Sequence, residues 1–377
     1  MASMSRRRYP ERPVPQADGE HLSSRDVRIG MLLSYSGGFA ETVAELTEHE
    51  QAGLDIVWVP EAYSYDAVSQ LGFLAARTTR VEIAAGVLQI YTRTPSLTAM
   101  TAAGLDYVSG GRFTLGLGAS NPQVVEGFHG VRYDAPVART REIVEICRAV
   151  WRRERLEHEG RHYRVPLPLE EGTGLGKPLR LINHPVRERI PIVLAALGPR
   201  NVALAAEIAE GWLPILYVPE RAGALWGSAL GEGTAKRDPA LGPLDVVGSA
   251  ALCITDDAAA ARRALDDQRP FVALYAGGMG ARGRNFYNDV VRGYGWEAQA
   301  REIQDLYLDG HKDAAAAAVP EEMLRQMALV GPRGHVAERL AAFAAAGVTT
   351  VNVTPFAGSA AERVAQVEAT VELAADA

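Results

Sequence analysis

The sequence is poor in cysteine and has no long apolar run. Only two cysteines occur in 377 residues, Cys147 in a stretch with a helical pattern and Cys253 in one typical of a strand. Two unclustered cysteines exclude a disulfide framework and a cysteine-based metal site. They fit a reducing compartment, so we expect a cytoplasmic protein. No segment has the apolar length that a membrane span requires. There is also no Walker loop, zinc-ligand spacing or nucleophile elbow, and we therefore predict no metal.

The chain also lacks an excess of positive charge. Its net charge is -7, which goes against a nucleic-acid partner. Residues 1–25 are polar and carry Arg6-Arg7-Arg8 without the apolar segment of a secretory signal. We predict a disordered leader there rather than a nucleic-acid contact, and a single domain over residues 26–377. A hydrophobic content of 47% supports a large globular core.

From Val27 onward, apolar segments typical of strands alternate with segments of helical pattern. The first units repeat about every thirty residues, the size of a βα unit. The predicted strands are residues 27–34, 54–59, 81–90, 112–118, 190–197, 212–216, 246–255 and 349–354. Their near-continuous apolar character indicates a parallel sheet that is buried on both faces. Eight such units predict an α/β protein with a closed (β/α)8 TIM barrel. A doubly wound open sheet is the alternative.

Two segments interrupt this repeat and are predicted to be insertions after strands 4 and 7. Residues 157–185 read as a surface hairpin with a long loop. Residues 276–320 would lie over the C-terminal mouth of a barrel, where ligands bind. The second segment carries Phe286 and Tyr287 and follows Tyr275, which favours a fairly hydrophobic substrate.

The fifth predicted strand runs into a turn with features of a phosphate site. Gly198 allows close approach of a ligand to the backbone, and Pro199 suits the first turn of a helix. The free N–H groups of that turn and the helix dipole favour an anion, and Arg200 adds a positive charge. An ordinary strand-to-helix turn is the alternative interpretation.

Polar residues follow the second predicted strand. Glu61 would point into the mouth of a barrel, where it could act as an acid or base or orient a cofactor ring. A salt bridge within the barrel is the alternative. Tyr63 and Tyr65 could stack on or hydrogen-bond a planar ligand, whereas Asp66 is predicted to cap the next helix.

Strands 3 and 4 end in further candidates. Gly86 within a buried strand indicates a bulge or a close ligand, with chain flexibility as the alternative. Small residues at the end of strand 4, Gly116, Gly118 and Ala119, would clear space for a ligand that Ser120 or Asn121 could bind, although an Asn-Pro turn needs no ligand. His129 could donate a proton or be structural.

These features together resemble the luciferase-like, flavin- or deazaflavin-dependent oxidoreductases, over nearly the whole chain from Val27. The resemblance rests on residues 58–62, 93–95, 109–113, 115–118, 195–199 and 277–280. Residues 122–130 resemble the actinobacterial subgroup assigned to coenzyme F420. Phe128 stands where that subgroup has tryptophan, so the local pocket is expected to differ.

The resemblance implies hydride transfer between the deazaflavin of coenzyme F420 and a small, fairly apolar molecule with a carbonyl or an activated C=C or C=N bond. It implies a cis peptide at Gly86-Val87 behind the cofactor ring. The residues it assigns to cofactor binding are Gly86, Val87, Ser120, Ala196, Leu197, Gly198, Pro199, Arg200 and Asn201. The catalytic candidates are Glu61, Tyr65 and His129, as proton donors or ring contacts.

Three points stay open within the resemblance. Reduced FMN with oxygen, in a monooxygenase reaction, is the alternative cofactor chemistry, and a non-catalytic flavin-binding protein is a further one. A basic groove for the anionic tail of F420 could include Arg200, Arg282 and Arg284. A homodimer is expected because barrels of this family often pair.

Overall fold

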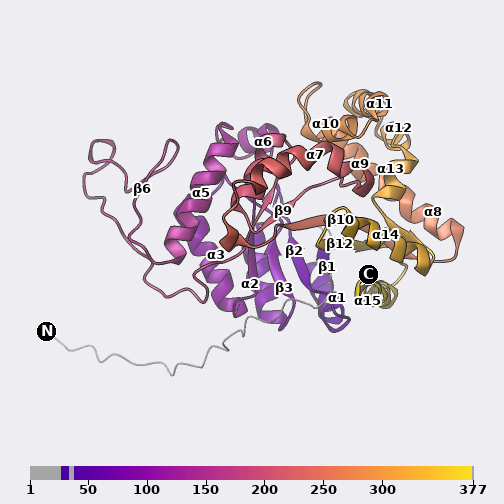
Figure 1. The fold of residues 1–377 in the computed structure, drawn as a ribbon, viewed down its shortest axis with the longest axis horizontal. Helices are drawn as coiled ribbons and strands as arrows, with labels where there is room; N and C mark the ends of the chain where they lie inside the picture. The colour runs from indigo at the N-terminus through magenta and orange to yellow at the C-terminus, as the bar shows by residue number, and fades with distance from the viewer. Residues whose placement is uncertain (1–26, 34–37, 376–377) are drawn as a thin grey trace.

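The computed structural model describes residues 27–33 and 38–375, so the predicted leader lies outside the described residues. Within that part of the chain, eight parallel strands close into a barrel (Figure 1). They are β1 (Arg28–Leu32), β2 (Ile56–Val59), β3 (Glu82–Ala85), β5 (Phe113–Gly118), β8 (Ile192–Ala195), β9 (Gly211–Leu213), β10 (Asp245–Ile254) and β12 (Thr350–Pro355). Each pairs with the next, and β12 pairs with β1 to complete the ring. The predicted (β/α)8 barrel is confirmed.

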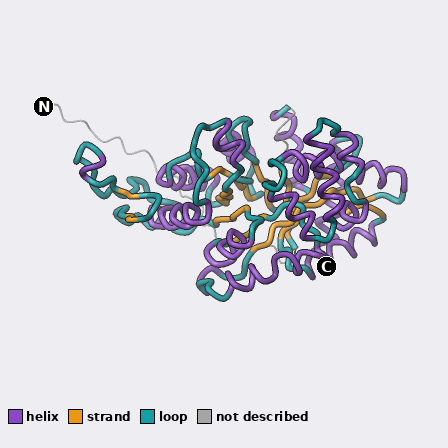
Figure 2. Tube along the Cα trace, turned by 90° about the horizontal axis from the view of Figure 1, so that it is seen from above, coloured by secondary structure: helices purple, strands orange, loops and turns teal. Residues whose placement is uncertain are grey.

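A helix follows each barrel strand on the outside of the barrel (Figure 2). These helices are α1 (Phe39–Gln51), α2 (Ala67–Arg77), α3 (Pro95–Ser109), α5 (Pro136–Trp151), α6 (Pro199–Ile208), α7 (Pro219–Thr234), α14 (Arg333–Ala345) and α15 (Ala360–Ala375). Gly53 and Gly347 end the turns after α1 and α14 with φ of 96° and 85°, values that favour glycine. The dipeptides Ala52-Gly53 and Ala346-Gly347 therefore form the same kind of turn at two places in the ring.

The strand predicted over residues 81–90 is interrupted and forms two strands, β3 and β4 (Leu88–Gln89). Pro95 follows β4 at the first helical position of α3, and the side chain of the N-cap residue Thr94 accepts from Leu97 N. Helix α6 ends at Ile208, three residues before Gly211.

Both insertions lie where the sequence predicts them. After α4 (Pro122–Gly127) and α5, the chain forms a two-stranded hairpin of β6 (His158–Glu159) and β7 (Arg164–Val165), followed by η1 (Leu169–Glu171). This segment projects beyond the helices (Figures 1 and 2). A short turn, η2 (Pro239–Leu241), precedes β10.

The longer insertion after β10 is mostly helical. It contains α8 (Ala258–Asp266), α9 (Arg269–Ala273), the π-helical turn η3 (Leu274–Gly278), α10 (Phe286–Gly293), α11 (Glu297–Leu308), α12 (Lys312–Ala317) and α13 (Glu321–Gln326). It leads to β11 (Leu329–Gly331), which extends the sheet beside the end of β10. Helices α10, α11 and α12 gather at one corner of the molecule (Figure 1).

The core has two parts, one between the strands and the helices and one inside the barrel. The inner part consists of Ile56, Trp58, Ala84, Val193 and Val247. Below it, at the amino ends of the strands, Arg28 on β1 forms an ion pair with Glu82 on β3 at 2.9 Å. The interior is thus filled by side chains, as in other barrels of this type, and ligand sites are expected at the carboxyl ends.

The motif Ser109-Gly110-Gly111-Arg112 has a structural role. Gly110 and Gly111 turn the chain with φ of 70° and 88°. The Arg112 guanidinium then donates to the carbonyl oxygens of Val81 and Thr78, at 2.6 and 3.0 Å. The motif therefore joins the ends of α2 and α3 to β3.

Candidate active site at the carboxyl ends of the strands

Glu61, two residues beyond β2, is held by an arginine from the loop after β4. Its Oε1 accepts from Arg93 Nη1 at 2.6 Å and its Oε2 accepts from Arg93 Nη2 at 2.8 Å. Oε2 also accepts from the backbone N–H of Ala67 at 3.0 Å. The hydrogen bonds to Glu61 raise the pKa of Arg93 above its usual value. The alternative predicted from the sequence, a salt bridge, is therefore present, and it engages both carboxylate oxygens as acceptors.

The rest of the loop after β2 faces solvent. Tyr65 is 84% exposed and Tyr63 is also exposed, with its ring centroid 6.1 Å from that of Phe128. Asp66 caps α2 by accepting from Ser69 N at 2.8 Å, which confirms the predicted cap. Of the two tyrosines, only Tyr63 is in contact with another aromatic ring of the candidate site.

The predicted cis peptide between Gly86 and Val87 is present. It separates β3 from β4, and the two glycines of β5 lie against it. A Cβ at Gly116 would collide with the carbonyl oxygen of Ala85, and one at Gly118 would lie 2.7 Å from Val87 Cγ2. The small residues of β5 thus make room for the neighbouring strand, which corrects the interpretation that they clear space for a ligand.

The segment after β5 provides a turn, a helix cap and a histidine. Ser120 has a φ of 57°, and the Asn121 side chain caps α4 by accepting from Val124 N at 3.0 Å. His129 follows α4, with its ring edge-on to Phe128 at 5.1 Å. His129 Nε2 is buried and has no hydrogen-bond partner among the described residues.

Gln89 was not among the residues singled out from the sequence. It lies on β4, is 3% exposed, and donates through Nε2 to the carbonyl oxygen of Ala62 at 3.4 Å. Its Oε1 is buried and has no partner in the described part of the chain. Buried polar atoms are normally hydrogen-bonded, so this oxygen can accept from a ligand or from a water molecule. The available signal was a single amide between the apolar residues Leu88 and Ile90.

The turn between β8 and α6 is anchored by two indoles. Trp212 Nε1 donates to the Ala196 carbonyl and Trp226 Nε1 donates to the Leu197 carbonyl, both at 2.9 Å. Gly198 is the N-cap residue of α6, and a Cβ built on it meets no atom within 4 Å. The carbonyl groups of this turn therefore point into the protein, while the space beside Gly198 is open.

The beginning of α6 retains only part of the predicted anion site. Pro199 occupies the first helical position and has no N–H, and the N–H of Asn201 already donates to the Gly198 carbonyl at 3.0 Å, so neither residue offers a free backbone donor to a ligand. Arg200 is exposed and forms no ion pair with another described residue. The cation is therefore available to a ligand at the helix N-terminus.

Of the three arginines predicted to line a basic groove, Arg282 already pairs with two acidic side chains. Arg282 forms ion pairs with Asp305 and Asp309 at 2.8 and 2.9 Å, within the insertion after β10. Its charge is balanced there, whereas Arg284 is exposed.

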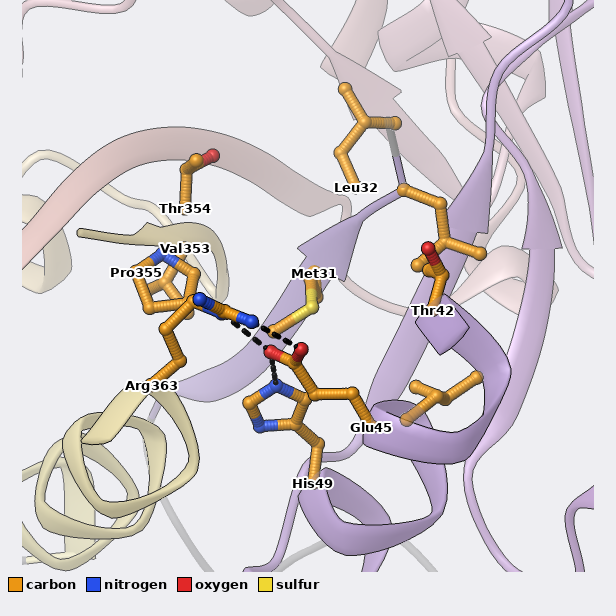
Figure 3. Close-up of a pocket in the computed structure, with 11 residues that line it drawn as sticks. Met31, Leu32, Thr42, Glu45, His49, Val353, Thr354, Pro355 and Arg363 are labelled. Carbon is orange, nitrogen blue, oxygen red and sulfur yellow. Dashed lines mark hydrogen bonds and ion pairs between the residues drawn. The ribbon is translucent and has the colours of Figure 1, made fainter. Parts of the chain in front are cut away.

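A cavity of about 200 Å³ lies away from these residues, between α1, α15 and the ends of β1 and β12 (Figure 3). Glu45 accepts from Arg363 Nε and Nη2 at 2.7 and 2.6 Å, and its Oε1 lies 3.3 Å from His49 Nε2. Burial lowers the pKa of His49. This network joins the first and last helices and includes no predicted site residue, nor does a second cavity of about 510 Å³ between α8 and α15.

Two further findings concern the described residues alone. They include no group of three or more His, Cys, Asp or Glu side chains arranged to hold a metal ion. No helix among them has the length and apolar character needed to span a bilayer.

Residues 23–350 match the model of the luciferase-like monooxygenase family. The chain belongs to this family. It is 45% identical over 342 residues to Rv3520c of Mycobacterium tuberculosis, whose name places it among the coenzyme F420-dependent oxidoreductases. That match covers 89% of this chain and 96% of the relative. The chain is thus a luciferase-like oxidoreductase, an enzyme.

Two solved structures have the same fold. The F420-dependent tetrahydromethanopterin reductase from Methanopyrus kandleri matches with a TM-score of 0.73 at 22% identity, over 91% of this chain and 97% of that one. The oxygenating constituent of 3,6-diketocamphane monooxygenase from Pseudomonas putida, in complex with FMN, matches with a TM-score of 0.64 at 19% identity, over 93% and 98%. At these identities the likeness concerns the fold alone.

Proposed function

We propose that this luciferase-like enzyme uses coenzyme F420 to transfer hydride to or from a small, fairly apolar organic substrate with a carbonyl or an activated C=C or C=N bond. The 45% identity to Rv3520c supports the choice of coenzyme. The single observation that carries the proposal for the site is the buried Nε2 of His129, which has no hydrogen-bond partner in residues 27–33 and 38–375. A buried polar atom without a protein partner is satisfied by a ligand or by water.

The residues present fit a long anionic cofactor. Gly86 and Val87 would support its ring from behind, and Ser120 lies at the end of the adjacent strand. The turn from Ala196 to Asn201 would hold the phosphate, because Gly198 leaves open space and the helix dipole of α6 favours negative charge. Reduced F420 supplies hydride from a ring carbon where FMN has a nitrogen, and the protein supplies position and charge.

His129 is our first candidate for proton delivery to the substrate. Histidine is the side chain that most often transfers protons in enzymes, and His129 Nε2 is shielded from bulk water and has no partner among the described residues. Glu61 is better suited to positioning, because Arg93 and Ala67 already engage both of its oxygens. Tyr65 would need the loop after β2 to move, since its side chain is exposed.

A titration with the two candidate cofactors tests the proposal. Tryptophan fluorescence of the purified protein is followed during addition of F420 and, separately, of FMN. Tight binding of F420 with weak binding of FMN supports the proposal, and the reverse order refutes it. His129→Gln should lower kcat with little effect on F420 affinity.

A reduced-FMN monooxygenase that uses oxygen is the second candidate. The family model and the FMN-bound diketocamphane enzyme, which has the same barrel, favour it. Oxygen consumption that depends on reduced FMN and on substrate would establish this alternative.

We also propose a cytoplasmic homodimer that acts on a small molecule and not on nucleic acid. Helix α3 exposes a face of uncharged side chains: Leu97, Met100, Tyr107 and Val108. Its other face is buried in the protein, and an exposed patch of large apolar side chains is typical of a surface that a partner covers. A second copy of this chain fits this face, because two copies of an uncharged surface can pack together without electrostatic repulsion.

The available area supports this pairing. These four exposed side chains offer roughly 400 Å² per copy, half of the about 800 Å² that each partner contributes to a standard interface. Light scattering should give the mass of a dimer for the parent protein and of a monomer for Met100→Lys. A monomeric parent, or a dimeric variant, would refute the assignment of this face.

A further inference from the structure

Aromatic rings from three distant segments stand beyond the carboxyl ends of β2, β5 and β10. We call Tyr63, Phe128, Phe271, Tyr275 and Tyr287 the aromatic wall. Tyr63 and Phe128 lie 6.1 Å apart, Phe271 and Tyr275 4.7 Å, and Tyr275 and Tyr287 4.8 Å, between ring centroids. The first two follow β2 and β5, and the other three belong to the insertion after β10. The wall thus combines the rim of the barrel with the insertion.

The two halves of the wall stand on the same rim of the barrel. Strands β2, β5 and β10 are parallel members of one ring, so the segments that follow them all leave its carboxyl end. Burial raises the pKa of Tyr275, and Tyr63 contributes to the same shift, in keeping with this placement.

Part of the wall is open to solvent. Phe128 is 66% exposed and Tyr63 nearly as much, and Phe271 is exposed as well. Single exposed aromatic residues are common, but a contiguous exposed aromatic surface marks a binding site. The wall is next to His129, whose ring packs edge-on against Phe128 and whose Nε2 has no partner among the described residues.

Hydrogen bonds hold the backbone that carries Tyr275 of the wall in one position. Asn285 Nδ2 donates to the carbonyl oxygens of Tyr275 and Ala276 at 2.9 and 3.1 Å. Asn288 Nδ2 donates to the Ala276 carbonyl at 2.9 Å. These buried amides satisfy carbonyl groups of the π-helical turn η3. Gly277 admits the Tyr307 side chain, which a Cβ would meet at 2.5 Å. Tyr275 is therefore held at a defined position.

The wall carries no charge, and two nearby charged groups are paired. Glu61 forms its ion pair with Arg93, and Arg282 forms one with Asp305. A charged ligand would gain little from these groups, whereas a flat aromatic ring would gain stacking and buried apolar area. We infer that the aromatic wall binds the substrate of this enzyme, and that this substrate is an uncharged, planar aromatic compound. The inference rests on the proposed function for the reaction that the bound compound undergoes, whereas the binding surface itself is argued from the structure alone.

Two ketones with the same bicyclic carbon skeleton test the inference. β-Tetralone has one flat aromatic ring and β-decalone has none, and both are uncharged. Their affinity for the cofactor-free protein is measured by calorimetry, with naphthoate as the charged aromatic comparison. We expect tetralone to bind about tenfold more tightly than decalone or naphthoate.

Variants locate the binding surface. Phe128→Ala should weaken tetralone binding by about fivefold to tenfold and leave decalone binding unchanged. Leu169→Ala is the matched control, because Leu169 is 67% exposed, close to the 66% of Phe128, but lies in the insertion after β5. It should change neither affinity. Thermal unfolding of each variant verifies that the fold is retained.

Three results would overturn the inference: equal affinity for the two ketones, equal loss of both in Phe128→Ala, or a loss of F420 affinity in that variant without a loss of tetralone affinity. The last result would assign the wall to the cofactor. Failure of the proposed function has a different signature, since tetralone would still bind while F420 would not.

Discussion

Replacement of Gly198 by valine is expected to separate cofactor binding from folding. Gly198 has φ of -71° and ψ of 146°, an extended conformation that valine adopts readily, and its Cβ would meet no protein atom within 4 Å. Because valine is a poorer N-cap residue than glycine, the free energy of unfolding should fall by about 1 kcal/mol, which leaves the protein folded. The added methyl groups would occupy the space in which an anion meets the N-terminus of α6. We expect F420 affinity to fall at least about tenfold, equivalent to about 1.4 kcal/mol.

Two measurements on each variant check this prediction: fluorescence titration with F420, using the five tryptophans, and unfolding in urea. Gly198→Ala should give an intermediate loss of affinity, because it adds one methyl group. Gly231→Ala is the control, since its Cβ also meets nothing within 4 Å but lies towards the end of α7. Parental F420 affinity in a folded Gly198→Val protein would mean that the phosphate does not lie beside this turn.

Three further predictions concern other parts of the chain. Glu61→Gln should lower the free energy of unfolding by about 2 kcal/mol, because it leaves the partly buried Arg93 without its counter-charge. Unfolding in urea measures this change, and an unchanged midpoint concentration of urea would show that the ion pair does not stabilise the fold. The lowered pKa of His49 means that the unfolded chain binds a proton below about pH 6.5 while the folded chain does not, so stability should fall as pH drops from 7 towards 5. His49→Gln should flatten this dependence, and an identical slope in both proteins would exclude His49 as its source. Burial raises the pKa of Cys147 to about 12 and also raises that of Cys253, so a thiol reagent should label neither cysteine until the protein unfolds.

The barrel was predictable because each unit carries its own local signals. The strands are apolar along their length, and the helices end at Gly53, Gly110 or Gly347, whose positive φ marks the turn. These signals act over a few residues and do not depend on the rest of the fold. The insertions were predictable for the complementary reason, since their polar hairpin and glycine-rich turn break the repeat.

The candidate site was only partly predictable because its contacts join distant segments. Glu61 could be found from its place after β2, but its partner Arg93 is 32 residues away, and only the pairing of β2 with β3 brings the two loops together. Gln89 escaped notice because one amide in an apolar strand gives no pattern. The glycines of β5 were misread because the backbone that fills their space belongs to another strand.

The tight fit between β5 and the cis-peptide segment limits how this protein can be engineered. At position 116 the carbonyl oxygen of Ala85 already occupies the volume of any side chain, and at position 118 Val87 does so. Libraries that randomise these codons would return only the parental glycine among folded clones. Variation in what the enzyme accepts must come instead from the loop after β2 and from the insertion after β10, where substitutions meet solvent rather than a neighbouring strand.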